Sequence, residues 1–175
     1  ADKRYFLNNT TGDANLLEFT DTVGKFKVNA VNPEHVIIFE NVETAYTDGT
    51  NHKARENMLH AAYKAGISFS MSYVGYIHAI AHSLGGQYGT PHGLANAVIM
   101  PYVLETYGES VYKKLHSLAI AAGISGEQDS DREAAEKFIR SIRALNAKMG
   151  IPDKLSGIRK EDIPVMARHA EKEAN

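Results

Sequence analysis

Three histidines, His78, His82 and His92, lie close together in a segment that is otherwise rich in apolar residues. Polar side chains are costly in an apolar helix unless they are hydrogen-bonded or bind a ligand. His78 and His82 are four positions apart and share one face of a helix, and the glycine-containing loop that follows can return His92 to that face. Neutral imidazole is a good ligand for Zn²⁺ and Fe²⁺, so the spacing indicates a metal site with His78 and His82 as the chelating pair. The alternative is that these histidines only form hydrogen bonds in the core or face solvent.

The absence of cysteine from the sequence excludes disulfides and thiolate metal sites. Histidine, aspartate and glutamate are then the strong metal ligands, and the chain contains eight histidines. Four of them lie among charged or polar neighbours and are expected to be solvated: His35, His52, His116 and His169.

The elements that must position the three clustered histidines are predicted to be helices. From Tyr73 to Leu84 the sequence is apolar almost all round, which is typical of a helix buried among others. Gly85-Gly86 is expected to end that helix, and a short loop through Gly89 and Pro91 leads to a new helix that begins near His92.

Apolar spacing and capping residues predict the remaining helices. They run from Pro33 to about Tyr46, from Asn51 onward, from Glu109 to Ala122, from Asp131 to Met149, and from Lys160 to about Glu173. Ser130 and Glu133 have the spacing of a capping box.

The first thirty-one residues are rich in turn-forming residues, and Lys25 to Val28 alternate as in a short strand or an extended lead-in. The sequence thus predicts an all-α bundle of about six helices over residues 32–175, after an irregular lead-in over residues 1–31.

Length and composition fit one compact domain, with 175 residues, 43% apolar and 23% charged. A formal net charge of -2 offers no basic field for phosphate backbones, so we expect no nucleic-acid partner. No apolar run approaches the roughly 20 residues that span a bilayer, and Ala1 to Tyr5 lack a following apolar segment. We therefore expect a cytoplasmic protein without membrane association.

Residues 75–96, which read GYIHAIAHSLGGQYGTPHGLAN, resemble the histidine signature of iron-containing (group III) alcohol dehydrogenases. The resemblance continues upstream at Ile38 to Asn41 and Ala54 to Met58, and downstream at Met100-Pro101 and Gly150 to Pro152. It covers about residues 37–175 and implies the dehydroquinate synthase-like α domain of these enzymes.

The resemblance implies roles that differ from those given by spacing alone. It makes His78 and His92 the ligands of Fe²⁺ or Zn²⁺, and it places His82 near nicotinamide and substrate as a proton relay. Residues 11–14 read TGDA, similar to the segment that holds the family's first ligand, which makes Asp13 a further candidate ligand; a turn residue after Gly12 is the alternative. Four residues later the family has a ligating histidine, whereas this chain has Leu17.

The resemblance also implies hydride transfer between NAD or NADP and a primary alcohol, diol or aldehyde, in a homo-oligomer. No glycine-rich strand-to-helix phosphate loop occurs among the fourteen glycines. We therefore expect the nucleotide-binding domain to be absent from this chain, and the chain alone to be inactive. A non-catalytic helical metal-binding or interaction domain is the alternative function.

Overall fold

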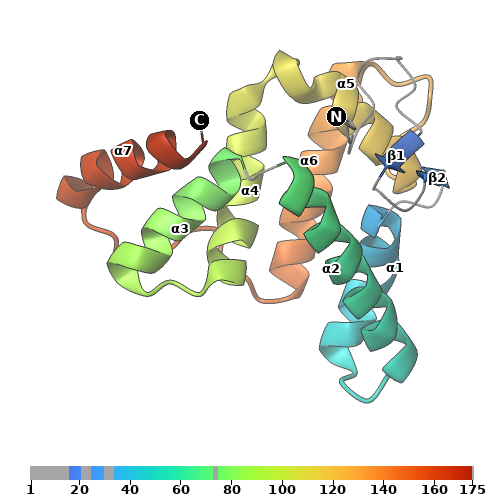
Figure 1. Cartoon of the computed structure of the whole chain (residues 1–175), viewed down its shortest axis with the longest axis horizontal. Helices are drawn as coiled ribbons and strands as arrows, with labels where there is room; N and C mark the ends of the chain where they lie inside the picture. The colour runs from blue at the N-terminus through green and yellow to red at the C-terminus, as the bar shows by residue number, and fades with distance from the viewer. Residues whose placement is uncertain (1–15, 21–24, 30–33, 73–74, 175) are drawn as a thin grey trace. The chain divides into compact units, whose positions relative to one another are not determined.

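The computed structural model of this chain describes residues 16–20, 25–29, 34–72 and 75–174. These residues form two compact units, Ala1–Tyr73 with Tyr112–Phe138, and Val74–Val111 with Ile139–Asn175. Seven α-helices and one two-stranded sheet occur in the described part of the chain (Figure 1). The predicted helical fold is confirmed, with one helix more than the expected six.

The lead-in contains a β-hairpin, where the sequence predicted irregular structure with a possible short strand. Strands β1 (Leu16–Thr20) and β2 (Lys25–Asn29) are antiparallel, and Leu17 is the partner of Val28. Alternation of apolar and charged residues in β2 suits a strand with one apolar face. Leu17, where the resemblance implies a ligating histidine, belongs to strand β1.

The first unit contains the helical pair α1 (Glu34–Thr47) and α2 (His52–Ser72), which pack against each other. The predicted cap of α2 is present, because the side-chain oxygen of Asn51 accepts a hydrogen bond from the backbone of Ala54 at 3.0 Å. Asn57 of α2 donates to the side-chain oxygen of Asn41 in α1 at 2.9 Å, which ties the two helices together.

Helices α5 (Glu109–Ala121) and α6 (Asp131–Lys148) begin and end close to the predicted positions. The capping box at the start of α6 is confirmed. The backbone N–H of Glu133 donates to the hydroxyl of Ser130 at 3.2 Å, and the Glu133 carboxylate accepts from the backbone N–H of Ser130 at 3.0 Å.

The prediction of a solvated His116 is wrong. Its side chain is only 13% exposed, its Nδ1 lies 2.7 Å from a carboxylate oxygen of Asp131, and its Nε2 lies 3.2 Å from the carbonyl oxygen of Gly126. The loop between α5 and α6 returns these acceptors to α5, which the polar local sequence did not reveal. The hydrogen bond to Asp131 raises the pKa of His116, more than burial lowers it.

This raised pKa predicts a pH-dependent stability. A histidine with a folded pKa above its unfolded value of about 6.5 stabilises the fold below that pH, and the stabilisation is lost as the pH rises through the folded pKa. Because Asp131 is half-exposed, we expect the contribution to be about 0.5–1 kcal/mol. Urea unfolding of the chain at acidic and alkaline pH measures it, and Asp131→Asn should remove this part of the pH dependence. An unchanged profile in Asp131→Asn would contradict the assignment.

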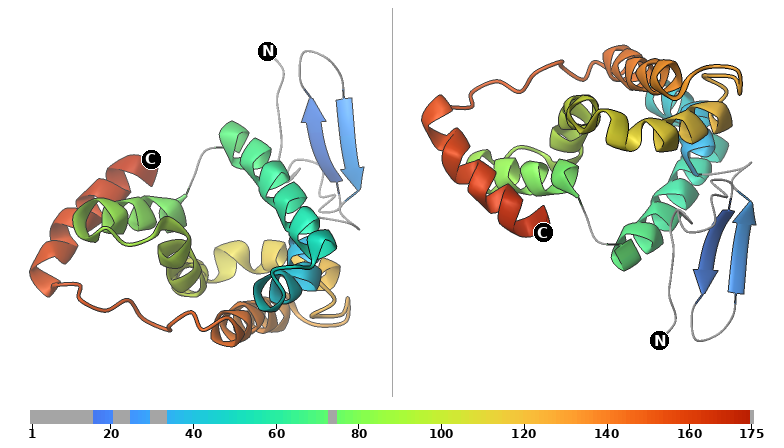
Figure 2. Two further views of the ribbon diagram at one scale, coloured as in Figure 1. Left: turned by 90° about the horizontal axis from the view of Figure 1, so that it is seen from below. Right: turned by 90° about the horizontal axis from the view of Figure 1, so that it is seen from above.

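The second unit contains α3 (Tyr76–Tyr88), α4 (His92–Tyr107), a short 3-10 helix (Lys160–Asp162) and α7 (Ile163–Ala174). Helix α3 packs against both α4 and α7, and Figure 2 shows α7 alongside α3 in both views. A cluster of buried side chains joins the three helices: Ala81, Leu84, Ala95 and Met166.

The expectation that Gly85-Gly86 ends α3 is wrong. The helix continues to Tyr88, and Gly89 ends it with φ at 63° and its N–H bonded to the carbonyl of Gly85 at 2.9 Å. Glycine inside a helix costs only about 1 kcal/mol, whereas the left-handed conformation at position 89 strongly favours glycine. The turn that follows leads directly into α4 at His92, as predicted.

Candidate metal centre

The structure brings His78, His82 and His92 together. His78 and His82 lie one turn apart on α3, and His92 is the first residue of α4. Ring centroids are 5.4 Å apart for His78 and His92, 6.0 Å for His78 and His82, and 5.1 Å for His82 and His92. The turn at Gly89 accounts for this convergence, because it reverses the chain directly after α3.

The environment of His78 favours neutral imidazole. Burial lowers its pKa, and the nearby His92 and His82 lower it further, against a smaller opposing effect of Glu173. Neutral imidazole has the free electron pair that a metal ligand needs. The surroundings of His78 therefore favour the form that binds a cation.

His92 has a polar neighbour one turn further along α4. The side-chain nitrogen of Asn96 lies 3.0 Å from Nε2 of His92 and also donates to the His92 carbonyl at 3.0 Å. Its side-chain oxygen is buried and has no hydrogen-bond partner within the described residues. A buried amide oxygen in this state is costly.

The described residues fit part of a coordination sphere for Fe²⁺ or Zn²⁺. Both ions accept imidazole nitrogens, and three imidazoles converge here. Within the described ranges, however, no group of three or more histidine, aspartate or glutamate side chains is arranged to hold a metal ion. Asp13 lies outside the described residues, and Leu17 lacks a ligating atom.

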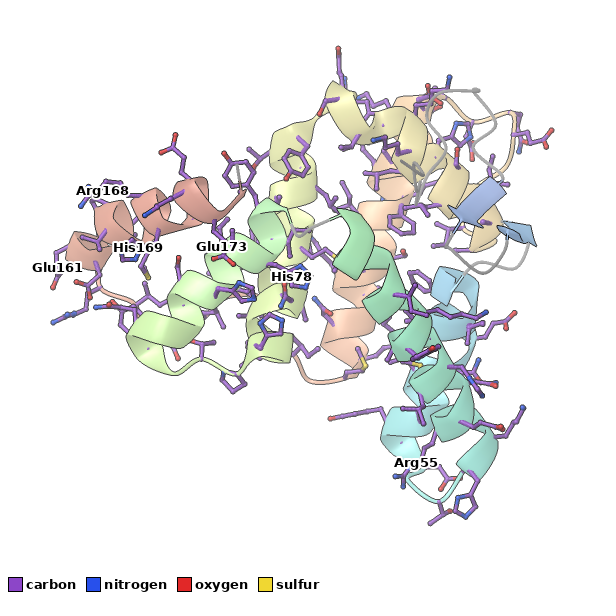
Figure 3. All side chains as sticks on the ribbon, in the orientation of Figure 1. Arg55, His78, Glu161, Arg168, His169 and Glu173 are labelled. Carbon is purple, nitrogen blue, oxygen red and sulfur yellow. The ribbon has the colours of Figure 1, made fainter. Side chains whose placement is uncertain are left out.

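Sequence reasoning did not single out Glu173 as a residue of the site. In the structure its carboxylate oxygen lies 2.5 Å from Nδ1 of His82, and the two side chains are 41% and 42% exposed. Figure 3 labels Glu173 and His78, whose side chains both lie at α3. The two paired residues are 91 positions apart in the chain, so no local pattern could have indicated the contact.

Two tyrosine hydroxyls support packing within the second unit. Tyr88 donates its hydroxyl hydrogen to Asp162 at 2.6 Å, and Tyr102 donates to the carbonyl of Asp153 at 2.9 Å. Both hydroxyls therefore join parts of the second unit.

Comparison with known proteins decides the family. Residues 20–175 match the description "Fe-containing alcohol dehydrogenase family, C-terminal". The chain belongs to this family. Relatives in the iron-containing alcohol dehydrogenase family include the 1,3-propanediol dehydrogenase of Citrobacter freundii, 40% identical over 141 residues, and alcohol dehydrogenase 4 of Saccharomyces cerevisiae, 39% identical over 138 residues. These alignments cover 79% and 77% of this chain, and 36% and 35% of the respective relatives.

Solved structures give the same answer for the fold. A 1,3-propanediol oxidoreductase is 38% identical with a TM-score of 0.76, and the alcohol dehydrogenase from Oenococcus oeni is 34% identical with a TM-score of 0.75. Each match covers 83% of this chain and 38% of the other chain. The chain therefore spans just over a third of the length of these relatives. Among its described residues, no helix is long and apolar enough to cross a membrane.

Proposed function

We propose that this chain supplies the metal-binding helical part of an NAD(P)-dependent alcohol dehydrogenase that acts on a primary alcohol, diol or aldehyde. The observation that carries the proposal is the convergence of three imidazole rings from α3 and α4 within a family match over residues 20–175. Relatives named 1,3-propanediol dehydrogenase and lactaldehyde reductase support small alcohols and aldehydes as the substrate class.

Each histidine has a distinct part in this proposal. His78 and His92 would hold Fe²⁺ or Zn²⁺, with Asp13 as a further ligand. When bound, the cation supplies Lewis acidity toward the substrate oxygen. His82, which is 42% exposed in its side chain and lies beside both ligands, would accept the hydroxyl proton and contact the nicotinamide. Hydrogen bonds join α3, which carries this imidazole, to α7 and to the 3-10 helix before it.

A chimeric enzyme tests the proposal. In it, this chain replaces the matching part of the Citrobacter freundii 1,3-propanediol dehydrogenase, to which it is 40% identical. We expect the chimera to oxidise 1,3-propanediol with NAD or NADP, whereas the 175-residue chain alone shows no measurable turnover because it carries no glycine-rich phosphate loop.

The alternative, a non-catalytic metal-binding or interaction domain, gives a different result. Leu17 favours this alternative, because the resemblance implies a ligating histidine at that position and leucine cannot bind a metal. A folded chimera that binds both metal and nicotinamide but lacks turnover would contradict the dehydrogenase proposal and favour this alternative.

A further inference from the structure

The carboxylate of Glu173 makes a short contact to the histidine that the proposed function places at the proton transfer. Its oxygen lies 2.5 Å from Nδ1 of His82. We infer that Glu173 is the positioning residue of His82 and fixes which ring nitrogen carries the proton. The inference rests on the proposed function for the role of His82, but the contact itself can be tested without metal or substrate.

Glu173 is held at this place by the packing of α7 on α3. Ser83 follows His82 on α3, and its hydroxyl donates to the carbonyl oxygen of Met166 at 3.2 Å. Tyr88 donates to Asp162 at 2.6 Å at the far end of α3. Met166 is buried with Leu84 in the cluster that joins these helices. These contacts hold the first turn of α7 at α3, and Ala170, one turn further along, is also buried.

The contact determines the tautomer of His82. An ionised carboxylate only accepts hydrogen bonds, so Nδ1 must be the protonated nitrogen at this distance. Nε2 is then the basic nitrogen whenever the ring is neutral, and it is the one free to take a proton. A carboxylate that orients a functional imidazole through its other nitrogen is a recurrent arrangement in metal and acyl-transfer sites.

The contact also restricts the orientation of the ring. The His82 ring is stacked on His92 at an interplanar angle of 21° and a centroid distance of 5.1 Å. With Nδ1 hydrogen-bonded to Glu173, rotation of the imidazole about its Cβ–Cγ bond would break that hydrogen bond. The basic nitrogen of His82 is thereby held in one direction relative to its two neighbouring histidines.

Nitrogen NMR of the 175-residue chain, labelled with ¹⁵N and free of metal, tests the inference. At pH about 8.5, well above the ordinary imidazole value of about 6.5, we expect Nδ1 of His82 to resonate as a protonated nitrogen and Nε2 as an unprotonated one. In Glu173→Ala the two resonances should move toward each other and exchange their order, because the free side chain prefers the opposite tautomer. Glu173→Gln keeps an accepting oxygen and should retain part of the wild-type pattern.

The matched control is Glu171→Ala, which removes a neighbouring exposed glutamate from the same helix. It should leave the His82 resonances unchanged. Unchanged amide resonances of α3 in both variants establish that α7 remains docked. If Nδ1 of His82 is unprotonated in the wild type, or if Glu173→Ala leaves the pattern intact with α7 docked, the inference is wrong. Failure of the chain to bind metal would overturn the proposed function but not this result, since no metal is present.

Discussion

Replacing His78 or His92 with alanine is expected to lower the affinity of the chain for Zn²⁺ or Co²⁺ by more than about a hundredfold. Each change removes a donor atom itself, and loss of a group that merely supports a ligand already costs about 10- to 100-fold. Burial and the neighbouring imidazoles lower the pKa of His78, which favours the neutral form that a metal ligand needs. Isothermal titration or competition with a chelating dye measures the loss.

Two further variants make this experiment decisive. His169→Ala removes an exposed histidine of α7 and should leave metal affinity unchanged. His82→Ala should lower it less than about tenfold, because the resemblance assigns the ligand pair to His78 and His92. If His82→Ala abolishes binding and His92→Ala does not, the pair suggested by helical spacing is the true one. A loss of metal affinity in Asp13→Ala would identify Asp13 as a third ligand.

The second large effect is expected for His82 in the chimeric enzyme. His82→Ala should lower kcat by about 10²- to 10⁴-fold, the range for removal of a general acid or base. Metal content and the affinity for nicotinamide should change little, since the other two histidines remain. Steady-state oxidation of 1,3-propanediol over a range of pH measures the loss.

A comparison with His116→Ala separates this effect from general destabilisation. His116 and its hydrogen-bond partner Asp131 both belong to the first unit, whereas the three clustered histidines belong to the second. Its replacement should affect stability and leave kcat within about twofold. A kcat in His82→Ala equal to that of the unmodified chimera would remove His82 from the proton transfer. A parallel loss in both variants would show that the effect is structural.

The sequence predicted those parts of the fold that depend on local interactions. The helix starts at Asn51 and Ser130 follow from capping, and a side chain of each cap residue forms the expected hydrogen bond. The clustering of His78, His82 and His92 follows from helical spacing and one turn, and the rings are indeed neighbours. The ligand roles of His78 and His92 stay predictions, which the metal-binding variants test.

The missed features depend on contacts between distant parts of the chain. Glu173 and Arg168 belong to one polar run, and packing of α7 brings Glu173 to His82. His116 was misjudged for the same reason, since the Asp131 and Gly126 acceptors reach it through a loop. Gly85-Gly86 was taken for a helix end because glycine composition does not reveal which glycine needs a positive φ; that residue is Gly89.

The sequence separation of the contacts at the histidine cluster implies an order in which they form during folding. His78 and His92 meet through a single turn between consecutive helices, whereas His82 and Glu173 close a segment of 91 residues. Closing the longer loop costs about 1.7 kcal/mol more in chain entropy. Local helix pairs also form faster than distant ones. The α3 and α4 hairpin therefore gathers its imidazoles early, and the carboxylate on α7 arrives as one of the last steps of folding.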